Sequence, residues 1–290
     1  MAHEIHYDIM PVYSDFHPVM LALHTFLQAN GWAVEYVDDI SSTNFRYAYT
    51  KNGIGITFYA YAAGRLYFYT GLGWDGVSLT PNYNFSNYAE GGGVHNHPID
   101  FRYTSAYYNN PWVFISHGDN LYIICPNAND ATAYTSIILG IGRLDKFGIY
   151  DDGIFRIQTR RYWPLGANQS TTYAGRGVMV GTRGRNGTSP HLWLAEYNQH
   201  TKNNYSVNVD QTVGYTNQST LVTPFQPVVW HGKDQDLDIW IPLGSLPGAL
   251  LCHTIDTHKV MDIIDHQGSQ WICVNEATNN YEVNNIFRLD

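Results

Sequence analysis

The chain has 290 residues, a formal net charge of −9 at pH 7, 44% hydrophobic residues and 14% charged residues. The hydrophobic content suffices for a folded core and excludes wholesale disorder. The negative charge argues against a general binder of nucleic acid or anionic membranes. Because charged residues lie well below the globular average of about 25%, the surface must be largely uncharged and polar, as in many protein interfaces.

The start of the chain and its cysteines bear on the compartment in which it folds. No charged stretch followed by an apolar one opens the sequence, so we expect no signal peptide, and no apolar run approaches the roughly 18 residues of a membrane helix. Cys125, Cys252 and Cys273 show no CxxC spacing, and each lies in an apolar run. We therefore expect buried free thiols, as in a protein that folds in a reducing cytoplasm.

A helical pattern occupies the first part of the chain. Asn30-Gly31 supplies a stop signal, and either Ser14 or Asp15 fits the N-cap position. These signals predict an amphipathic helix over about 15–30. The apolar residues recur at the spacing of one helix face: Phe16, Met20, Leu23 and Leu27.

After Gly31 the apolar period changes to the two-residue period of strands. The pair Asn52-Gly53 separates two such segments and predicts a tight hairpin, because both residues tolerate positive φ. The expected strands are 45–50, 54–62, 66–70, 112–117, 121–125, 134–139, 155–160, 192–197, 228–230, 237–241, 271–274 and 285–289, with bends at Gly140, Gly142 and Gly148 and a short helical turn over 258–264.

Two long polar stretches interrupt the strands. Residues 71–110 and 166–190 are too long for ordinary connections, and we interpret them as projecting loops. The pattern as a whole predicts one α+β domain over 1–290. We expect it to be predominantly antiparallel β, arranged as a meander or sandwich, with one N-terminal amphipathic helix.

Positive charge is concentrated in one part of the chain. Residues 143–185 contain eight Lys or Arg against three Asp, a net charge of +5 that leaves −14 for the remainder. A chain with this asymmetry can associate head to tail, with the basic zone of one copy on the acidic zone of the next. Alternatively, the basic face is solvated and balanced by nearby carboxylates in the fold.

The same basic zone contains four candidate contact residues, Arg160, Arg161, Tyr162 and Trp163. Arginines interleaved with aromatic residues can bind single-stranded nucleic acid, but they also form the hot spots of protein interfaces. The acidic charge of the whole chain favours the protein interface. A second set of candidate contact residues lies in the 71–110 stretch: Tyr83, Phe85 and Tyr88.

His95 and His97 form the one candidate metal site. In an extended segment these residues share a side and could bind a metal with a third ligand such as His117, or they could simply form hydrogen bonds in a loop.

The acidic run 234–238 begins like a calcium loop but lacks the required glycine and glutamate further on, so we interpret it as a strand with an acidic exposed face. No nucleotide-binding, zinc-protease or nucleophile-elbow motif occurs, and we expect no catalytic residue and no cofactor.

Three parts of the sequence resemble a group of tailed-bacteriophage virion structural proteins. Residues 21–32 read LALHTFLQANGW, where a helix ending in Asn-Gly-Trp leads directly into strands. In the middle, LYIIC at 121–125 and IILGIGRLDKFG at 137–148 resemble a strand pair followed by a glycine-bounded G-x-L-x-K-x-G segment. The C-terminal part is similar too, with Leu246-Pro247-Gly248, the run 268–274 and the closing residues 287–289.

The resemblance implies a structural component of the tail, baseplate or neck of a virion, assembled in the host bacterial cytoplasm. It also implies several copies that contact one another and other virion proteins, with no enzyme activity. From the charge and the lack of long apolar runs we expect no membrane and no sequence-specific nucleic acid as partners. Two alternatives stay open. One is a metal-dependent hydrolase built on His95 and His97. The other is a glycan- or receptor-binding module of a phage tail, with stacking platforms at Trp74, Tyr83, Tyr107 and Tyr108.

Overall fold

A computed structural model describes parts of the chain that are separated by gaps, and in some strands it describes the backbone alone. The described residues are 2–7, 9, 16–41, 44–60, 65–74, 83–84, 99–100, 110–126, 137–146, 154–159, 177–183, 190–195, 207–208, 223–225, 228–231, 241–253, 260–274 and 283–290.

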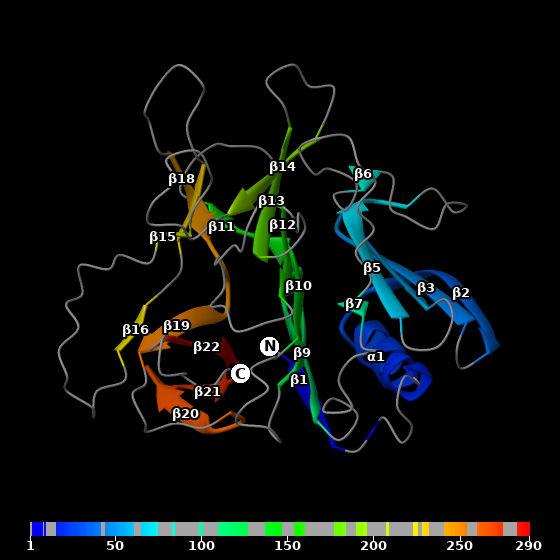
Figure 1. Cartoon of the computed structure of the whole chain (residues 1–290), viewed down its shortest axis with the longest axis horizontal. Helices are drawn as coiled ribbons and strands as arrows, with labels where there is room; N and C mark the ends of the chain where they lie inside the picture. The colour runs from blue at the N-terminus through cyan, green and yellow to red at the C-terminus, as the bar shows by residue number, and fades with distance from the viewer. Residues whose placement is uncertain are drawn as a thin grey trace.

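Antiparallel β-strands dominate this part of the chain, and one helix, α1 (His17–Ala29), accompanies them (Figure 1). The strands form four sheets, and every strand pair in them is antiparallel. The predominantly antiparallel β class predicted from the sequence is therefore confirmed. In the described residues no helix is both long enough and apolar enough to cross a membrane.

The largest sheet has seven strands and is called the central sheet. Its order is β1-β8-β9-β10-β12-β13-β14. The strands are β1 (Ala2–His6), β8 (Trp112–His117), β9 (Asn120–Cys125), β10 (Ile137–Arg143), β12 (Ile154–Thr159), β13 (Gly177–Arg183) and β14 (Pro190–Ala195).

A six-stranded sheet, called the N-terminal sheet, has the order β2-β3-β4-β5-β6, with β7 also paired to β5. Its strands are β2 (Ala33–Ser41), β3 (Asn44–Lys51), β4 (Ile54–Ala60), β5 (Arg65–Leu72), β6 (Tyr83–Asn84) and β7 (Ile99–Asp100).

Two further sheets are built mainly from the last third of the chain. The C-terminal sheet has the order β16-β19-β22-β21-β20, and a small sheet has the order β11-β18-β17-β15. Their strands are β16 (Thr223–Phe225), β19 (Ala249–His253), β20 (Ile263–His266), β21 (Ser269–Cys273), β22 (Val283–Arg288), β11 (Asp145–Lys146), β15 (Val207–Asn208), β17 (Val228–His231) and β18 (Ile241–Ser245).

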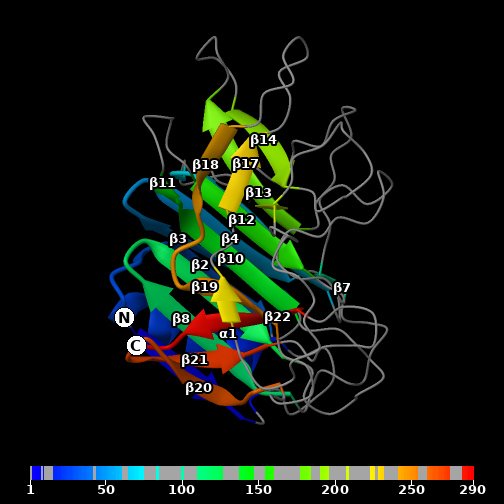
Figure 2. The same ribbon diagram turned by 90° about the vertical axis from the view of Figure 1, so that its left-hand side faces the viewer.

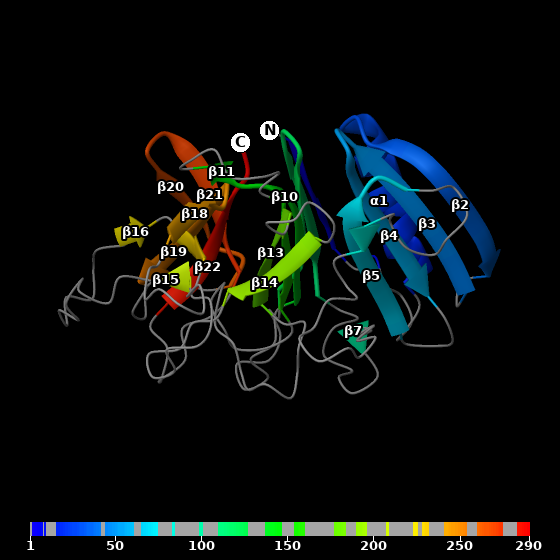
Figure 3. The ribbon, with the colours of Figure 1, turned by 90° about the horizontal axis from the view of Figure 1, so that it is seen from above.

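The sheets stack as layers around the central sheet. Figure 3 shows α1 between the N-terminal sheet and one face of the central sheet, with the C-terminal sheet on the other face. The small sheet lies beside the C-terminal sheet on that second face (Figure 2). The chain ends meet at the same place, where His3 Nδ1 lies 2.7 Å from the carbonyl oxygen of Leu289.

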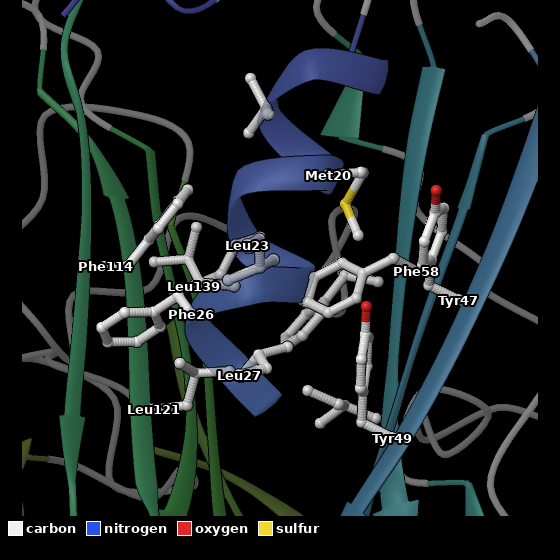
Figure 4. Packing of buried hydrophobic residues seen from close by; sticks show 14 of the residues in the cluster. Met20, Leu23, Phe26, Leu27, Tyr47, Tyr49, Phe58, Phe114, Leu121 and Leu139 are labelled. Carbon is white, nitrogen blue, oxygen red and sulfur yellow. The ribbon is translucent and has the colours of Figure 1, made fainter. Parts of the chain in front are cut away.

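The helix fills the space between two sheets. Its buried side chains contact aromatic residues of β3 and β4 on one side and apolar residues of the central sheet on the other (Figure 4). Phe26, for example, lies 5.8 Å from Phe114 of β8, measured between ring centroids. The buried helix positions are Val19, Met20, Leu23, Phe26 and Leu27, which share the face predicted by the periodicity.

The central strands are apolar on both faces because both faces are covered. On β8, Trp112 and Phe114 belong to the core around α1, whereas Val113 and Ile115 belong to the core under the C-terminal sheet. Tyr122 of β9 lies in this second core, and its hydroxyl donates to the carbonyl oxygen of Pro247 at 2.5 Å. Because successive side chains of a strand point to opposite faces of the sheet, the central sheet contributes to both cores.

Two expected turns occur as the sequence predicts. Asn52 and Gly53, with φ values of 47° and 81°, form a two-residue loop between β3 and β4. Both positive values fit the type I′ turn that suits the strand twist. Gly31, at φ 77°, follows the C-cap residue Asn30, so the expected helix stop is also observed.

The start of the helix differs from the prediction. The N-cap is Phe16, which has no capping side-chain hydrogen bond, so neither Ser14 nor Asp15 occupies that position. Both residues lie outside the described part of the chain. Burial explains the choice, because Phe16 is 1% exposed and packs edge-on against Trp112 at 6.5 Å. Tertiary packing therefore sets this end of the helix in place of a cap.

Several strands also differ from the prediction. Gly140 and Gly142 lie inside β10 and do not bend the chain out of the sheet, while Gly148 and Tyr134 lie outside the described residues. Of the strand expected at 237–241 the structure describes Ile241 alone, which begins β18 (Ile241–Ser245), while β20 follows a turn where a helical turn was expected. Strands β1, β2, β13 and β19 had not been expected, and β6, β7 and β13 lie within the two stretches interpreted as loops.

Candidate interaction surface

Most of the contact residues predicted from the sequence lie outside the described part of the chain. This is the case for Arg160, Arg161, Tyr162, Trp163, Phe85, Tyr88, His95 and His97. Tyr83 is in β6, of which the structure describes the backbone, paired with Leu72 of β5. The predictions made for these residues stay predictions.

Arg143 belongs to the basic zone, and the structure places it in a polar cluster between layers. Its Nη2 donates to the carbonyl oxygen of Asn52 at 2.8 Å, and its Nε lies 3.7 Å from the Asp119 carboxylate. Asp119 in turn accepts from the Asn52 amide at 2.6 Å. This arginine is therefore balanced by a nearby carboxylate and connects the tips of two hairpins.

Lys51 completes the cluster from the other side. Its ammonium donates to the carbonyl oxygen of Asn30 at 2.8 Å and to that of Gly118 at 2.5 Å. Asn30 closes α1, Lys51 ends β3, and Gly118 lies in the turn between β8 and β9. Charge-assisted hydrogen bonds to backbone carbonyls thus connect the helix and the N-terminal sheet to the central sheet. We call Lys51, Asn52, Asp119 and Arg143 the hairpin clamp.

Gly142 is required for the geometry at the clamp. The backbone N–H of Arg143 donates to Asn120 Oδ1 at 2.7 Å. A Cβ on Gly142 would lie 1.8 Å from that oxygen and 2.8 Å from the Asn120 Cα. A side chain at position 142 would therefore displace Asn120 and break the approach of β10 to β9.

The outer face of the N-terminal sheet, which faces away from α1, carries a cluster of aromatic and charged side chains. The guanidinium carbon of Arg46 lies 3.8 Å above the centroid of the Tyr36 ring, and the rings of Tyr36 and Trp74 are 5.7 Å apart at 59°. The Tyr36 hydroxyl donates to the Asp38 carboxylate at 3.2 Å. All four residues, Tyr36, Asp38, Arg46 and Trp74, are half-buried. We call this group the outer aromatic cluster.

Strand register explains why these residues meet. Tyr36 of β2 pairs with Ala48 of β3, and Asp38 pairs with Arg46 two residues further along the same face. Arg46 also pairs with Tyr59 of β4, which is half-buried. A cation above an aromatic ring and a carboxylate within reach of a tyrosine hydroxyl give both apolar area and directional hydrogen bonding.

Sequence reasoning named Trp74 as a stacking residue but did not find Tyr36 or Arg46. Trp74 lies two residues after the end of β5, where the chain leaves the sheet. The missing signal was β2 itself, because its two irregularities of register, near Glu35 and Ile40, disturb the two-residue alternation. Reading Tyr36 and Asp38 as one face of a strand would have pointed to this cluster.

His24 on α1 has structural partners on the N-terminal sheet. His24 Nδ1 lies 2.9 Å from the Tyr49 hydroxyl, and its ring lies 5.7 Å from that of Tyr47. Burial, followed by the positive charge of Arg288, lowers the pKa of His117. Among the described residues no three His, Cys, Asp or Glu side chains gather as a group that could hold a metal ion.

Cys125 and Cys273 are buried and not bonded to another cysteine. Burial raises the pKa of both thiols, that of Cys273 to about 12, with a smaller contribution from Asp262. Both are therefore unreactive thiols at neutral pH. Cys252 lies in β19, of which the structure describes the backbone at that position.

The chain was also compared with known proteins. No protein-family model matches it, and no curated protein matches it.

Proposed function

We propose that the chain is a structural subunit of a tailed-bacteriophage virion, placed in the tail, baseplate or neck region, and that it acts by contact with other virion proteins and with copies of itself. No enzyme activity is part of this function. The proposal includes the finer fold assignment, one α+β domain over 1–290 with an amphipathic helix. It starts from the sequence resemblance, and the surface of the N-terminal sheet adds a physical reason.

The outer aromatic cluster is the observation that supports a contact function. Trp, Tyr and Arg are the residues most enriched among interface hot spots, because each combines a large apolar area with a polar tip. On one sheet face, the centroid of the Tyr36 ring lies 3.8 Å from the Arg46 guanidinium carbon and 5.7 Å from the centroid of the Trp74 ring. Behind this face, the hairpin clamp and α1 fix the N-terminal sheet to the central sheet.

A rigid layered core suits this role. Side chains of β8, β9 and β10 are buried in both cores, so these strands cannot shift without opening two cores. A subunit of this kind keeps its shape while neighbouring subunits pack against it. The cost of ordering surface side chains at such a contact is offset by the apolar area that becomes buried.

The test is the location of the chain in a purified particle. We expect mass spectrometry of virions from the phage that encodes this chain to detect it in several copies. Cryo-electron microscopy of the same particles should place it in the neck, tail or baseplate. Virions that lack the chain, or a purified chain whose turnover of a small molecule is abolished by one side-chain change, would contradict the proposal.

The predicted basic contact set can be tested in the same particles. Replacing both arginines, Arg160→Glu together with Arg161→Glu, should leave the subunit folded and soluble but reduce its incorporation into particles, because the reversed charges repel an acidic partner surface. Normal incorporation of this variant would exclude the basic zone as a contact.

The outer aromatic cluster also favours the second candidate, a glycan-binding module. The faces of sugar rings stack on Trp and Tyr, while Asp38 and the Arg46 guanidinium supply an acceptor and several donors for hydroxyl groups. A glycan array probed with the wild-type chain and with Trp74→Ala distinguishes the glycan-binding module from the structural subunit. Binding that depends on Trp74 supports the glycan module, and no binding by the folded chain excludes it.

A further inference from the structure

Strand β1 forms an uninterrupted edge of the central sheet. It ends the strand order of that sheet, so among the described strands its outer side has no partner. β1 pairs with β8 in one unbroken register, from Ala2 opposite Ser116 to His6 opposite Trp112. In such a pair, alternate residues direct their backbone N–H and C=O groups away from the neighbouring strand. These groups form a template on which another strand can add.

The other sheet edges carry features that oppose the addition of a strand. β2 has two register irregularities, and β14 and β16 contain Pro190 and Pro224, which lack a backbone donor. β6, β11 and β15 have two residues each, and β20 has four, with Asp265 exposed on it. Among the strands that end the four described sheets, β1 is therefore the longest one with a regular register and no proline.

The side chains of β1 divide between the two faces of the central sheet. Ala2 packs against the core around α1, and the His6 ring lies 5.1 Å from that of Phe114 in the same core. Ile5 packs against the core under the C-terminal sheet. Glu4 shares the face of His6, and its Oε2 lies 2.9 Å from His6 Nε2. One face of this edge strand thus presents a carboxylate beside an imidazole.

The sequence of β1 is complementary to itself in one antiparallel register. Residues directly opposite each other lie on the same face, so a two-fold contact between two β1 strands is centred on one residue. When that residue is Ile5, Glu4 of each copy lies opposite His6 of the other, and the two Ile5 side chains meet on the other face. Acid–base pairs and pairs of β-branched residues stabilise a sheet at such positions, whereas a contact centred on Glu4 would oppose two carboxylates.

The exposed side chain of Tyr7 gains a partner in the same register. Tyr7 follows β1 and is 68% exposed, more than any other large hydrophobic side chain of the described residues. In the register centred on Ile5 it lies opposite His3 of the second copy. A tyrosine ring and an imidazole opposite each other contribute apolar contact at the end of the strand pair.

We propose that β1 is a self-association edge, to which β1 of a second copy adds in the antiparallel register centred on Ile5. The contact is isologous, because the same strand of both copies forms it, and it closes as a dimer about a two-fold axis. The two central sheets become one continuous sheet across the contact. This inference deepens the proposed function and rests on it, because it names one partner of a multi-copy subunit and the strand that binds it.

Disulfide formation between two copies tests the register directly. Ile5→Cys places two sulfurs opposite each other, at a Cα separation of about 5 Å that a disulfide can span. The background carries Cys252→Ser, and the remaining Cys125 and Cys273 are buried. We expect the purified full chain with Ile5→Cys, oxidised with copper phenanthroline, to run mostly as a covalent dimer on a non-reducing gel.

Tyr7→Cys in the same background is the matched control. Position 7 is more exposed than position 5, so random collisions would link Tyr7→Cys faster. The proposed register instead holds its two sulfurs about 13 Å apart along the strands, beyond the reach of a disulfide. We expect Tyr7→Cys to form the covalent dimer about tenfold more slowly than Ile5→Cys. Equal rates, or faster linkage of Tyr7→Cys, overturn the inference.

Exchange of the acid–base pair gives a second test, by sedimentation velocity of the full chain at increasing concentration. His6→Glu opposes carboxylates on both sides of Ile5 and should weaken association by about tenfold or more. Glu4→His together with His6→Glu restores both pairs in reverse order and should recover association. Thr25→Glu, at an exposed position of α1, adds the same charge elsewhere and should associate as the wild type does.

Urea unfolding of each variant shows that it is folded, and the disulfide test does not depend on His6. A wild-type chain that stays monomeric up to about 0.1 mM overturns the inference. A folded double variant that associates as weakly as His6→Glu does so too.

Particles separate this inference from the proposed function. Virions that contain the Ile5→Cys chain but yield no covalent dimer on oxidation refute the edge contact and leave the proposed function standing. Virions that lack the wild-type chain refute the proposed function, while the purified chain still decides whether β1 strands pair. Virions that yield the covalent dimer with Ile5→Cys but not with Tyr7→Cys support both.

Discussion

The imidazole Nδ1 of His24 lies 2.9 Å from the hydroxyl oxygen of Tyr49, and this contact connects α1 directly to β3. Tyr49 is fully buried, and burial together with the neighbouring Tyr47 raises the pKa of its hydroxyl far above the ordinary value. The hydroxyl therefore stays protonated at all ordinary pH values. Because a buried polar group is costly when it has no partner, His24 satisfies the one polar atom of the Tyr49 side chain at this layer boundary.

Tyr49→Phe should lower the free energy of unfolding by about 1 kcal/mol, which is the usual net contribution of such a hydrogen bond. The ring remains and keeps its packing against Phe58, so we expect no cavity. Urea unfolding followed by circular dichroism measures the change. Tyr36→Phe is a matched control, since its hydroxyl bonds to Asp38 at 3.2 Å on the half-exposed outer face and should cost less. Equal losses in the two variants would contradict this account.

Gly142→Ala should destabilise the chain by roughly 2 kcal/mol, because the new methyl group overlaps Asn120. The Cβ would lie 1.8 Å from Asn120 Oδ1 and 2.8 Å from the Asn120 Cα. Removing the side chain of Asn120 relieves only the first overlap, so Asn120→Ala should not fully restore Gly142→Ala. Thermal unfolding of the two single variants and the double variant tests this, and full restoration would show that the backbone contact is harmless.

His117 should make the fold sensitive to acid. Its pKa in the folded chain is lowered from 6.5, because burial and then Arg288 disfavour the charged ring, while Asp145 opposes them. As pH falls below 6.5, the unfolded chain takes up a proton that the folded chain resists, so this part of the stability is complete above pH 6.5 and is lost as pH falls. His117→Gln should flatten the pH dependence of urea unfolding below pH 6.5. An unchanged slope would refute this assignment.

The sequence predicted the elements whose signals are local. Asn52-Gly53 and Asn30-Gly31 occupy the positive-φ positions that their residue types favour. The helix face was predicted because Met20, Leu23 and Leu27 point to one core. These signals depend on neighbours in the sequence and are independent of the rest of the fold.

The sequence could not predict features set by contacts between distant segments. The Phe16 cap depends on Trp112, and the β10 glycines were interpreted as bends because the close approach of Gly142 to Asn120 is visible only in the folded sheet. The outer aromatic cluster was missed for the same reason, since Tyr36 and Arg46 meet through strand register. Residue composition indicated that a Trp-, Tyr- and Arg-rich surface should exist but could not say on which sheet face.

The buried thiols offer a reagent test of the layered core. In a Cys252→Ser background, Cys125 and Cys273 are the remaining cysteines, and burial raises the pKa of each. We expect the native chain to react very slowly with a thiol reagent at pH 8, because the thiolate is the reactive form and neither sulfur reaches solvent.

Both sulfurs should react rapidly when urea unfolds the whole chain. Cys125 belongs to the core around α1, and Cys273 to the outer core of the C-terminal sheet. Two separate rates at low urea would therefore show that these cores open independently.

The hairpin clamp should stabilise the contact between the N-terminal and central sheets, and Asp119 is the residue to remove. Asp119→Ala leaves Arg143 Nε without its carboxylate and the Asn52 amide without its acceptor. The groups are partly exposed, so solvent compensates in part and we expect a loss of about 1 kcal/mol. Lys146→Ala, on the exposed strand β11 of the small sheet, is the matched charge-removing control and should change stability by less than about 0.5 kcal/mol. Because the clamp joins two layers, hydrogen exchange of Asp119→Ala should increase at the Asn52 and Gly118 turns while the C-terminal sheet keeps its protection. A uniform increase throughout the chain would show that the clamp has no local role.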